Sequence, residues 1–331
     1  MHKVVITDYL APPADIEQAA LAGVAEVTCL QETSTASLIG RLDDADGLIV
    51  FHEISMPREV IETLAKCKVI VRCGVGFDSV DLTAAGERGI LVCNVPDYGV
   101  DEVADHAIGM MLGCARGLFV ADRLLKRTLS PWNYRAVQPV HRIAGRTMGI
   151  VGLGRIGSAT ALRAKGLRMR LIACDPYLPS GMDKALGVEM VDLDTLLTTS
   201  DVVSLHVPLT DETRGMIDAS ALAKMKPGAF LINTARGAVV DVDALADALA
   251  KRRIAGAGID VLPTEPPGES ERLIQLWQAE HDPPMNLIIT PHSAFYSEEG
   301  LIEMRRKAGE ELRRVLMGES PRNCVNAEYL K

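Results

Sequence analysis

Three polar residues in the second half of the chain have the types and positions for shared acid–base chemistry. Arg236, Glu265 and His292 each follow a short apolar run that predicts a strand: "LINTA", "GIDVLPT" and "LIITP". The carboxyl ends of parallel strands meet at one edge of a sheet, where open α/β sheets bind ligands. Taken singly, the three are also explained as a surface cation, a solvated loop carboxylate and a strand-end hydrogen-bond donor. Their shared position favours one common site.

The three side chains suit the reduction of a carbonyl group that neighbours a carboxylate. A hydride that reaches the carbonyl carbon builds negative charge on the oxygen, and the imidazolium of His292 is suited to supply the proton. A carboxylate hydrogen-bonded to the imidazole holds its orientation and favours its protonated form, and Glu265 is the candidate for it. The planar fork of Arg236 suits a substrate carboxylate.

A glycine-rich stretch predicts a dinucleotide site. Gly152-Leu-Gly154-Arg-Ile-Gly157 follows the strand pattern "MGIV" and precedes the helical pattern "SATALRAKG". The first glycine allows a tight turn, the second lets backbone approach a pyrophosphate, and the third allows close packing of the helix whose N-terminus attracts phosphates. Asp175 ends the next strand pattern, where a carboxylate binds ribose hydroxyls and repels a 2′-phosphate. NAD(H) is therefore favoured over NADP(H). The alternative to a dinucleotide site is a structural turn between strand and helix, with Asp175 as a capping residue.

Short β-rich runs alternate with helical patterns along the chain, which predicts an α/β fold with parallel sheets. One series runs from "KVVITD" to "LVCNV", and a second, from "TMGIV" to "LIIT", has six strand candidates at the spacing of a doubly wound nucleotide-binding sheet. Between the two series, residues 100–126 predict one long helix or two in succession. The amphipathic segment after Ser297 predicts a helix that returns to the first domain.

Composition argues against several classes of partner. The 331 residues, 48% of them hydrophobic, are enough for two domains with separate cores. The net charge of -9 argues against nucleic acid or an anionic membrane as the main partner. The N-terminal residues lack the pattern of a secretion signal, and no apolar run is long enough to span a membrane. Seven scattered cysteines without C-x-x-C spacing predict a cytoplasmic protein, and no His/Cys cluster has metal-ligand spacing.

The motifs together resemble a known family. The stretches "GLGRIG", "CDPY", "HVPLTDETRGMI", "MKPGAFLINTARGAVVD", "AGAGIDVLPTEPP" and "TPHSAFYSEEG" closely resemble the D-isomer-specific 2-hydroxyacid dehydrogenases. The stretches "VIVRCGVGFDSVDL" and "CNVPDYGVDEVADHAIGMML" extend the resemblance towards the N-terminus. It implies a Rossmann dinucleotide-binding domain, 101–295, inserted in a smaller flavodoxin-like α/β domain, 1–100 and 296–331. It also implies NAD as cofactor, a 2-oxo or 2-hydroxy acid as substrate, and a homodimer, for which we expect the apolar helix from Asp101 to form the pairing surface.

The resemblance assigns roles to individual residues. Arg236 matches the substrate-binding arginine, Glu265 the carboxylate partner, and His292 the acid/base that protonates the carbonyl oxygen. With the glycine motif, the expected cofactor contacts are Gly152, Gly154, Arg155, Ile156, Gly157, Asp175, Val207, Pro208, Thr213, Thr234, Ala235, Arg236, Asp260 and His292. The expected substrate contacts are Val75, Gly76, Arg236, His292 and Phe295, with backbone amides of the loop 73–76 holding the substrate carboxylate.

Some alternatives stay open at this point. Glu265 argues against formate as substrate, because the formate dehydrogenases pair their histidine with a glutamine. Substrates like glyoxylate, hydroxypyruvate or phosphoglycerate all fit the motifs. The first-domain stretches look most like the branch of the C-terminal-binding-protein corepressors, so an NAD(H)-sensing corepressor-like protein with weak dehydrogenase activity is the alternative function. Those corepressors carry a tryptophan where this chain has Phe295.

Two further histidines receive less specific predictions. His106 lies on the helix that carries Met110 and Met111 and is more typical of a packed core or interface residue. His206 precedes Val207 at a strand end that borders the expected cofactor site, but the sequence indicates no proton for it to transfer.

Overall fold

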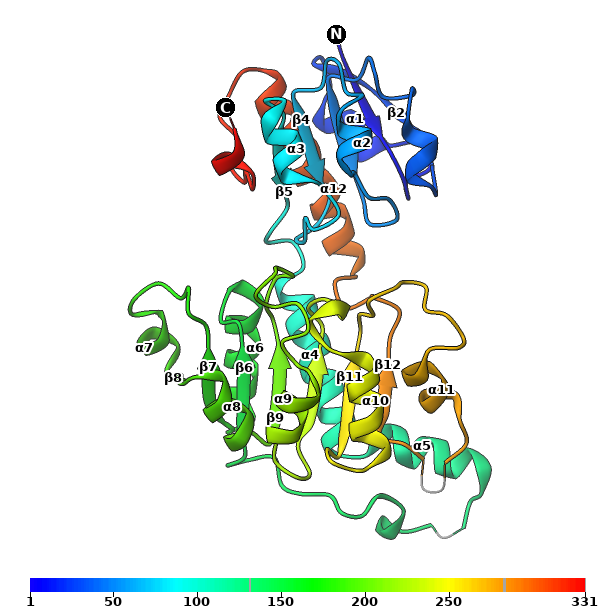
Figure 1. The fold of residues 1–331 in the computed structure, drawn as a ribbon, viewed down its shortest axis with the longest axis vertical. Helices are drawn as coiled ribbons and strands as arrows, with labels where there is room; N and C mark the ends of the chain where they lie inside the picture. Colours follow the sequence, from blue (N-terminus) through cyan, green and yellow to red (C-terminus); the bar gives the residue numbers. More distant parts are fainter. Residues whose placement is uncertain (131, 282–283, 331) are drawn as a thin grey trace. The chain divides into compact units, whose positions relative to one another are not determined.

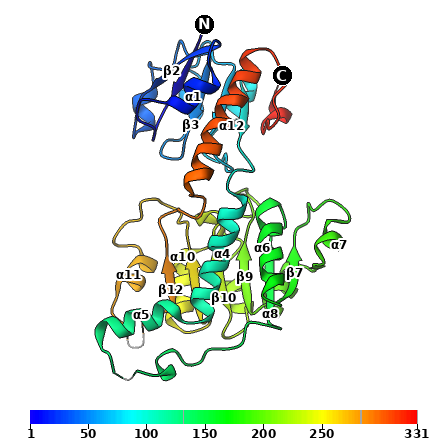
Figure 2. The same ribbon diagram turned by 180° about the vertical axis from the view of Figure 1, so that it is seen from behind.

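The computed structural model describes residues 1–130, 132–281 and 284–330. It divides into two compact units, one made of Met1–Gly99 with the segment from Tyr296 onward, and the other of Val100–Phe295. Figures 1 and 2 show the first unit in blue to cyan, with its C-terminal part in orange to red, and the second unit in cyan-green through yellow to light orange. Both units are α/β structures built on parallel sheets, as the sequence predicts.

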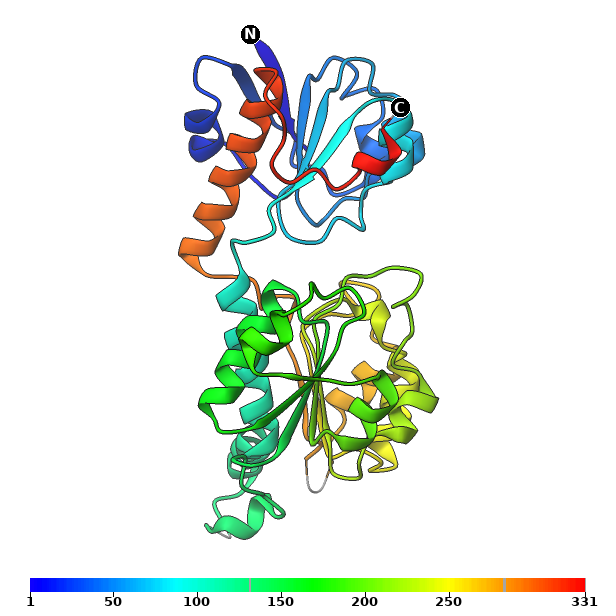
Figure 3. The ribbon, with the colours of Figure 1, turned by 90° about the vertical axis from the view of Figure 1, so that its left-hand side faces the viewer.

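The first unit contains a five-stranded parallel sheet in the order β2-β1-β3-β4-β5, the flavodoxin-like arrangement. Its strands are β1 (His2–Ile6), β2 (Ala25–Cys29), β3 (Gly47–Val50), β4 (Val69–Arg72) and β5 (Leu91–Asn94). Its helices are α1 (Asp15–Ala20), α2 (Arg58–Ile61), α3 (Leu82–Glu87) and α12 (Glu298–Leu316), with short 3-10 turns at η1 (Thr35–Leu38) and η4 (Ala327–Tyr329). Helices α1 and α12 cover one face of this sheet and α2 and α3 the other (Figure 3).

Helix α12 belongs to the first unit although it lies far along the chain. Arg305 on α12 forms two 2.7 Å hydrogen bonds with the carboxylate of Glu17 on α1, and Glu17 is fully buried. Leu312 packs so closely on β3 that a Cβ added at Gly47 would lie 2.7 Å from it. A buried carboxylate needs such a paired cation, so the contact fixes the chain's return to the first unit.

The second unit contains a seven-stranded parallel sheet in the order β12-β11-β10-β9-β6-β7-β8, the doubly wound Rossmann arrangement with an added strand. Its strands are β6 (Thr147–Val151), β7 (Arg170–Cys174), β8 (Glu189–Met190), β9 (Val202–Leu205), β10 (Phe230–Asn233), β11 (Gly256–Ile259) and β12 (Leu287–Ile289). The edge strand β8 was not predicted, because two residues carry no readable hydrophobic pattern.

Helices cover both faces of the second sheet. On one face lie α4 (Val100–Ala115), α5 (Leu118–Arg127), α6 (Arg155–Gly166) and α7 (Met182–Leu186). On the other lie α8 (Leu193–Thr199), α9 (Ala219–Lys224), α10 (Val242–Ala250) and α11 (Arg272–Gln278). Two 3-10 turns, η2 (Tyr134–Val137) and η3 (Gly237–Val239), complete the unit.

Residues 100–126, predicted as one long helix or two in succession, form two helices. Gly117, with φ of 62°, separates α4 from α5. The apolar face of α4, including Met110 and Met111, is buried against α6 and the strands of its own unit. The apolar face of α4, expected at the pairing surface, is therefore already covered. The exposed apolar side chains follow later, on α5 and in the segment after it, at Leu118, Phe119, Leu129, Trp132 and Tyr134.

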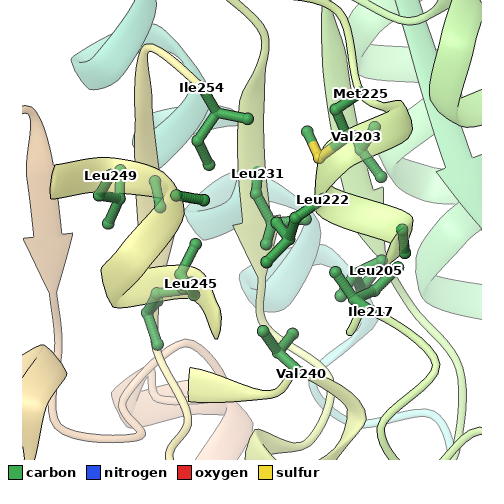
Figure 4. Close-up of a cluster of buried hydrophobic side chains, with 14 of the residues drawn as sticks. Val203, Leu205, Ile217, Leu222, Met225, Leu231, Val240, Leu245, Leu249 and Ile254 are labelled. Atoms are coloured by element: carbon green, nitrogen blue, oxygen red, sulfur yellow. The ribbon is translucent and has the colours of Figure 1, made fainter. Parts of the chain in front are cut away.

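Buried aliphatic side chains hold the second sheet rigid. Figure 4 shows one such cluster, where Val203 and Leu205 of β9 and Leu231 of β10 meet Leu222 and Leu245 from the covering helices. Each fully buried leucine contributes roughly 2 kcal/mol through removal of apolar surface from water. Because β6, β9 and β11 are buried along their whole length, their carboxyl ends form a fixed edge for the loops that follow.

Several helices begin with a capping side chain. Asp81, Asp192, Asp218 and Asp241 accept backbone N–H groups in the first turns of α3, α8, α9 and α10, and Ser297 does the same for α12. Such caps satisfy N–H groups that have no partner inside the helix. Among the helices described, none has the length and apolar character needed to cross a bilayer.

Candidate active site

His292 and Glu265 form a close hydrogen-bonded pair in the second unit. Nδ1–H of His292 donates to Oε2 of Glu265 at 2.6 Å. The other carboxylate oxygen, Oε1, accepts the backbone N–H of Leu262 at 2.8 Å. The side chains of His292 and Glu265 are 30% and 36% exposed, so a ligand can reach the pair.

The environment keeps the Glu265 carboxylate ionised. Burial alone would raise its pKa, but the hydrogen bond and charge of His292 lower it, with help from the Leu262 amide and the charge of Arg236. The net result is a pKa of Glu265 below its ordinary value. The imidazole therefore faces a negative partner at neutral pH.

His292 lies in a tight turn after β12. Its φ of 51° is left-handed, which costs a non-glycine residue roughly 1–2 kcal/mol. Asp260, at the end of β11 and only 2% exposed, holds this turn. Its carbonyl accepts the N–H of His292 at 2.8 Å, and its carboxylate accepts the N–H groups of Ser293 and Ala294 at 2.9 and 3.0 Å. These bonds offset the strain and fix the direction of the imidazole.

Arg236 is the N-cap residue of η3 and lies three residues beyond the end of β10. The turn that carries it is shaped by buried Asn233, whose side chain donates to the carbonyl of Arg236 and accepts the N–H of Ala235, both at 3.0 Å. A Cβ added at Gly237 would lie 1.9 Å from the backbone carbon of Leu262, so this loop packs against the one that leads to Glu265. The three predicted residues thus come from loops after three neighbouring strands, β10, β11 and β12.

The glycine loop has the close approaches that the motif predicts. A Cβ at Gly152, where φ is 88°, would lie 2.7 Å from the carbonyl oxygen of His206, and one at Gly157 would lie 2.0 Å from the oxygen of Gly152. Gly154 stands before α6 with no neighbouring atom within 4 Å of a Cβ, which leaves space for a phosphate at the helix N-terminus. Asp175 accepts the N–H groups of Leu153 and Tyr177 at 2.8 and 2.9 Å, which ties it to this loop.

The first unit's candidate residues lie in the loop after β4. The carbonyl of Val75 accepts the side-chain amide of Asn94 at 2.6 Å, and the carbonyl of Gly74 accepts the N–H of Val95 at 3.0 Å. Both bonds join the loop that contains Gly76 to the end of β5. The loop is therefore fixed within its own unit, with its conformation set at Gly74 by a φ of 146°.

Comparison with known proteins shows the family to which the second unit belongs. Residues 108–294 match the family model for the NAD binding domain of D-isomer specific 2-hydroxyacid dehydrogenases. The chain belongs to the D-isomer-specific 2-hydroxyacid dehydrogenase family. Its site combines the NAD-binding domain of that family with the His292–Glu265 pair.

Relatives from several organisms match nearly the whole chain. A D-3-phosphoglycerate dehydrogenase of Methanocaldococcus jannaschii is 37% identical over 327 residues, which make up 98% of this chain and 60% of the relative. The chain thus spans about 60% of the length of this curated relative. The crystal structure of the TT0316 protein from Thermus thermophilus is 34% identical, with a TM-score of 0.84 over 98% of this chain and 99% of that one. The D-lactate dehydrogenase of Aquifex aeolicus complexed with NAD and lactic acid is 31% identical, with a TM-score of 0.84 over 96% of each chain.

These family relations bear on the open alternatives. They support NAD as the cofactor. They lend no support to the corepressor-like function, and the resemblance to the corepressor branch stays a prediction.

The remaining cofactor candidates surround the same sheet edge. Thr234 and Ala235 follow β10, and the hydroxyl of Thr234 is buried without a hydrogen-bond partner among the described residues. A bound polar ligand would satisfy that hydroxyl. In the loop after β9, Thr213 donates its hydroxyl proton to the carbonyl of Pro208 at 2.6 Å, which fixes the loop that begins at Val207. Arg155 and Ile156 open α6 beside the glycines. These features fit a dinucleotide.

Proposed function

We propose that the protein is an NAD-dependent dehydrogenase that interconverts a 2-oxo acid and a D-2-hydroxy acid. The observation that carries this proposal is the 2.6 Å hydrogen bond between His292 and Glu265. It lies at the carboxyl edge of a sheet whose glycine loop fits a dinucleotide.

We assign each side chain a role in this reaction. The bound nicotinamide supplies or accepts the hydride. Because Nδ1 of His292 is engaged by Glu265, the proton for the carbonyl oxygen is held at Nε2. Arg236 binds the substrate carboxylate and stabilises the charge that develops on the oxygen. A positioned general acid of this kind typically contributes about 10²–10⁴-fold in rate.

We favour an unphosphorylated substrate over a phosphorylated one. The ring of Phe295 lies 6.2 Å from that of His292, edge to face at 83°. It places apolar surface close to the proton donor, which suits a small or apolar substituent such as that of glyoxylate, hydroxypyruvate or pyruvate. A phosphate requires cations or several N–H donors instead. Phosphohydroxypyruvate is therefore the second candidate, suggested by the phosphoglycerate dehydrogenase relative.

A substrate panel tests the proposal. NADH oxidation is followed with glyoxylate, hydroxypyruvate, pyruvate, branched and aromatic 2-oxo acids, and phosphohydroxypyruvate. We expect turnover of an unphosphorylated acid, and the absence of turnover with every compound would refute the dehydrogenase function. His292→Ala should lower kcat by at least about 10²-fold while NADH binding, measured by fluorescence, changes little. His141→Ala, at an exposed histidine ahead of β6, is the matched control and should keep wild-type turnover.

A further inference from the structure

A chain of hydrogen bonds joins His106 on α4 to the turn that carries His292. Nε2 of His106 lies 3.0 Å from the hydroxyl oxygen of Thr290. That hydroxyl lies 2.5 Å from Oδ1 of Asp260 and donates its proton there. Since a hydroxyl has one proton, the contact from His106 requires an N–H on Nε2. The same nitrogen lies 3.7 Å from Oδ1 of Asp260.

Asp260 transmits this chain to the candidate proton donor. Its carboxylate and carbonyl together hold the three consecutive amides of residues 292–294. Oδ1, the oxygen that accepts from Thr290, is also the one that accepts from Ser293. Any rotation of this carboxylate would release the turn and redirect His292.

Helix α4 gives His106 a fixed position. Met110, one turn further along, packs over β11 so closely that a Cβ at Gly258 would lie 2.8 Å from its Cβ. Gly258 lies in β11 and Asp260 directly follows the strand, so helix and turn share one rigid support. The side chain of His106 is 25% exposed while that of Asp260 is 1% exposed, so His106 covers the buried carboxylate from outside.

We propose that His106 is a positioning residue for His292, acting through Thr290 and Asp260. This inference rests on the proposed dehydrogenase function. The sequence predicted His106 only as a packed core or interface residue, and this proposal adds a role in orienting His292. The N–H on Nε2 holds the Thr290 hydroxyl so that its proton stays on Asp260. The carboxylate then keeps the orientation that the turn needs.

Kinetics of paired variants test the proposal. His106→Leu removes the N–H but keeps apolar volume, and His106→Gln places an amide N–H near the position of Nε2. We expect His106→Leu to lower kcat at least tenfold with little change in KM for the 2-oxo acid, and His106→Gln to stay within about threefold of wild type. Met111→Ala truncates a fully buried side chain of the same helix that lies near Arg146 and Asp201, at the opposite edge of the sheet, so it should lower the Tm and leave kcat unchanged.

A double-variant cycle identifies the route. Thr290→Val removes the hydroxyl and should lower kcat about as much as His106→Leu. The double variant should lose no more than either single variant, because one chain is broken in each case. Multiplied losses in the double variant, or a loss in His106→Gln equal to that in His106→Leu, would show that His106 does not act through Thr290.

Amide hydrogen exchange gives a readout that needs no turnover. His106→Leu should speed exchange at Ser293 and Ala294 at least tenfold, while Met111→Ala leaves these amides at the wild-type rate. Unchanged exchange in His106→Leu would overturn the positioning role. If the wild-type protein reduces none of the 2-oxo acids, the proposed function fails, and the exchange experiment still decides whether His106 holds the turn.

Discussion

His292 donates through Nδ1 to Oε2 of Glu265, and the two residues lie on loops after the neighbouring strands β12 and β11. The carboxylate is itself oriented by the Leu262 amide, and its pKa lies below the ordinary value despite the opposing effect of burial. A fixed negative charge therefore faces one nitrogen of the imidazole. In the proposed function, this arrangement leaves Nε2 to carry the proton that is transferred.

Glu265→Gln should remove the negative charge beside His292 while it keeps the hydrogen bond to Nδ1. The amide oxygen can still accept from Nδ1, but the imidazolium loses its negative neighbour. We expect kcat/KM to fall about 10–100-fold at neutral pH. The rates are measured at pH 7, where Glu265 is ionised in the wild-type protein. An unchanged kcat/KM in the variant would mean that the charge has no part in the reaction.

Local patterns made much of the fold predictable. Apolar runs that end at glycine, proline or polar residues predicted the long strands, and the glycine motif predicted the loop before α6. Arg236, Glu265 and His292 were singled out because each follows such a run, and their catalytic roles stay predictions. The structure adds the distance between His292 and Glu265 and the contacts that orient them.

The remaining features depend on packing between distant segments. The contact from His106 to Thr290 joins residues 184 positions apart, and no local pattern indicates it. Thr290 itself was not singled out, although a hydroxyl residue directly before "PH" is the one signal that could have drawn attention to it. The separation of α4 from α5 at Gly117 was left open because a glycine is tolerated inside many helices.

Asp175 should determine the choice between NAD(H) and NADP(H). Its carboxylate stands at the end of β7, tied to the glycine loop through the Leu153 amide, where a 2′-phosphate would meet its charge. In Asp175→Ser we expect KM for NADH to rise at least about tenfold and KM for NADPH to fall. Both are measured with one 2-oxo acid at saturation. Asp183→Ser, on α7, is the control, and an unchanged preference in Asp175→Ser would contradict the assignment.

We propose that pairing of two copies uses α5 and the segment after it. Leu129, Trp132 and Tyr134 are 71%, 74% and 71% exposed, whereas the apolar face of α4 is buried in its own unit. The three lie close together in the sequence, and exposed apolar surface is what a protein interface covers. Leu129→Glu with Trp132→Glu should convert a dimer to a monomer in sedimentation experiments. Leu162→Glu on α6, a residue 55% exposed, should leave the dimer intact. A monomeric wild-type protein would refute the proposed pairing.

His206 should make stability sensitive to mild acid. Burial lowers its pKa from 6.5 to about 4. Its Nε2 lies 2.9 Å from the hydroxyl of Ser204, while Nδ1 is buried without a partner among the described residues. The folded protein therefore holds this imidazole neutral at a pH where the unfolded chain takes up a proton. The contribution is intact above about pH 6.5 and is lost as the pH falls towards 4.

His206→Gln should reduce this loss, because glutamine stays neutral and can still hydrogen-bond to Ser204. Urea unfolding at pH 7 and pH 4.5 gives the fall in the free energy of unfolding for each protein. We expect the fall to be about 2 kcal/mol smaller in the variant than in wild type, as the pKa difference implies. Buried and paired carboxylates also contribute to the fall in the free energy of unfolding in this pH range. They do so equally in both proteins, so the difference between wild type and variant reports on His206. His141→Gln, at an exposed position, should follow the wild-type curve. Parallel losses in wild type and His206→Gln would mean that His206 is not held neutral.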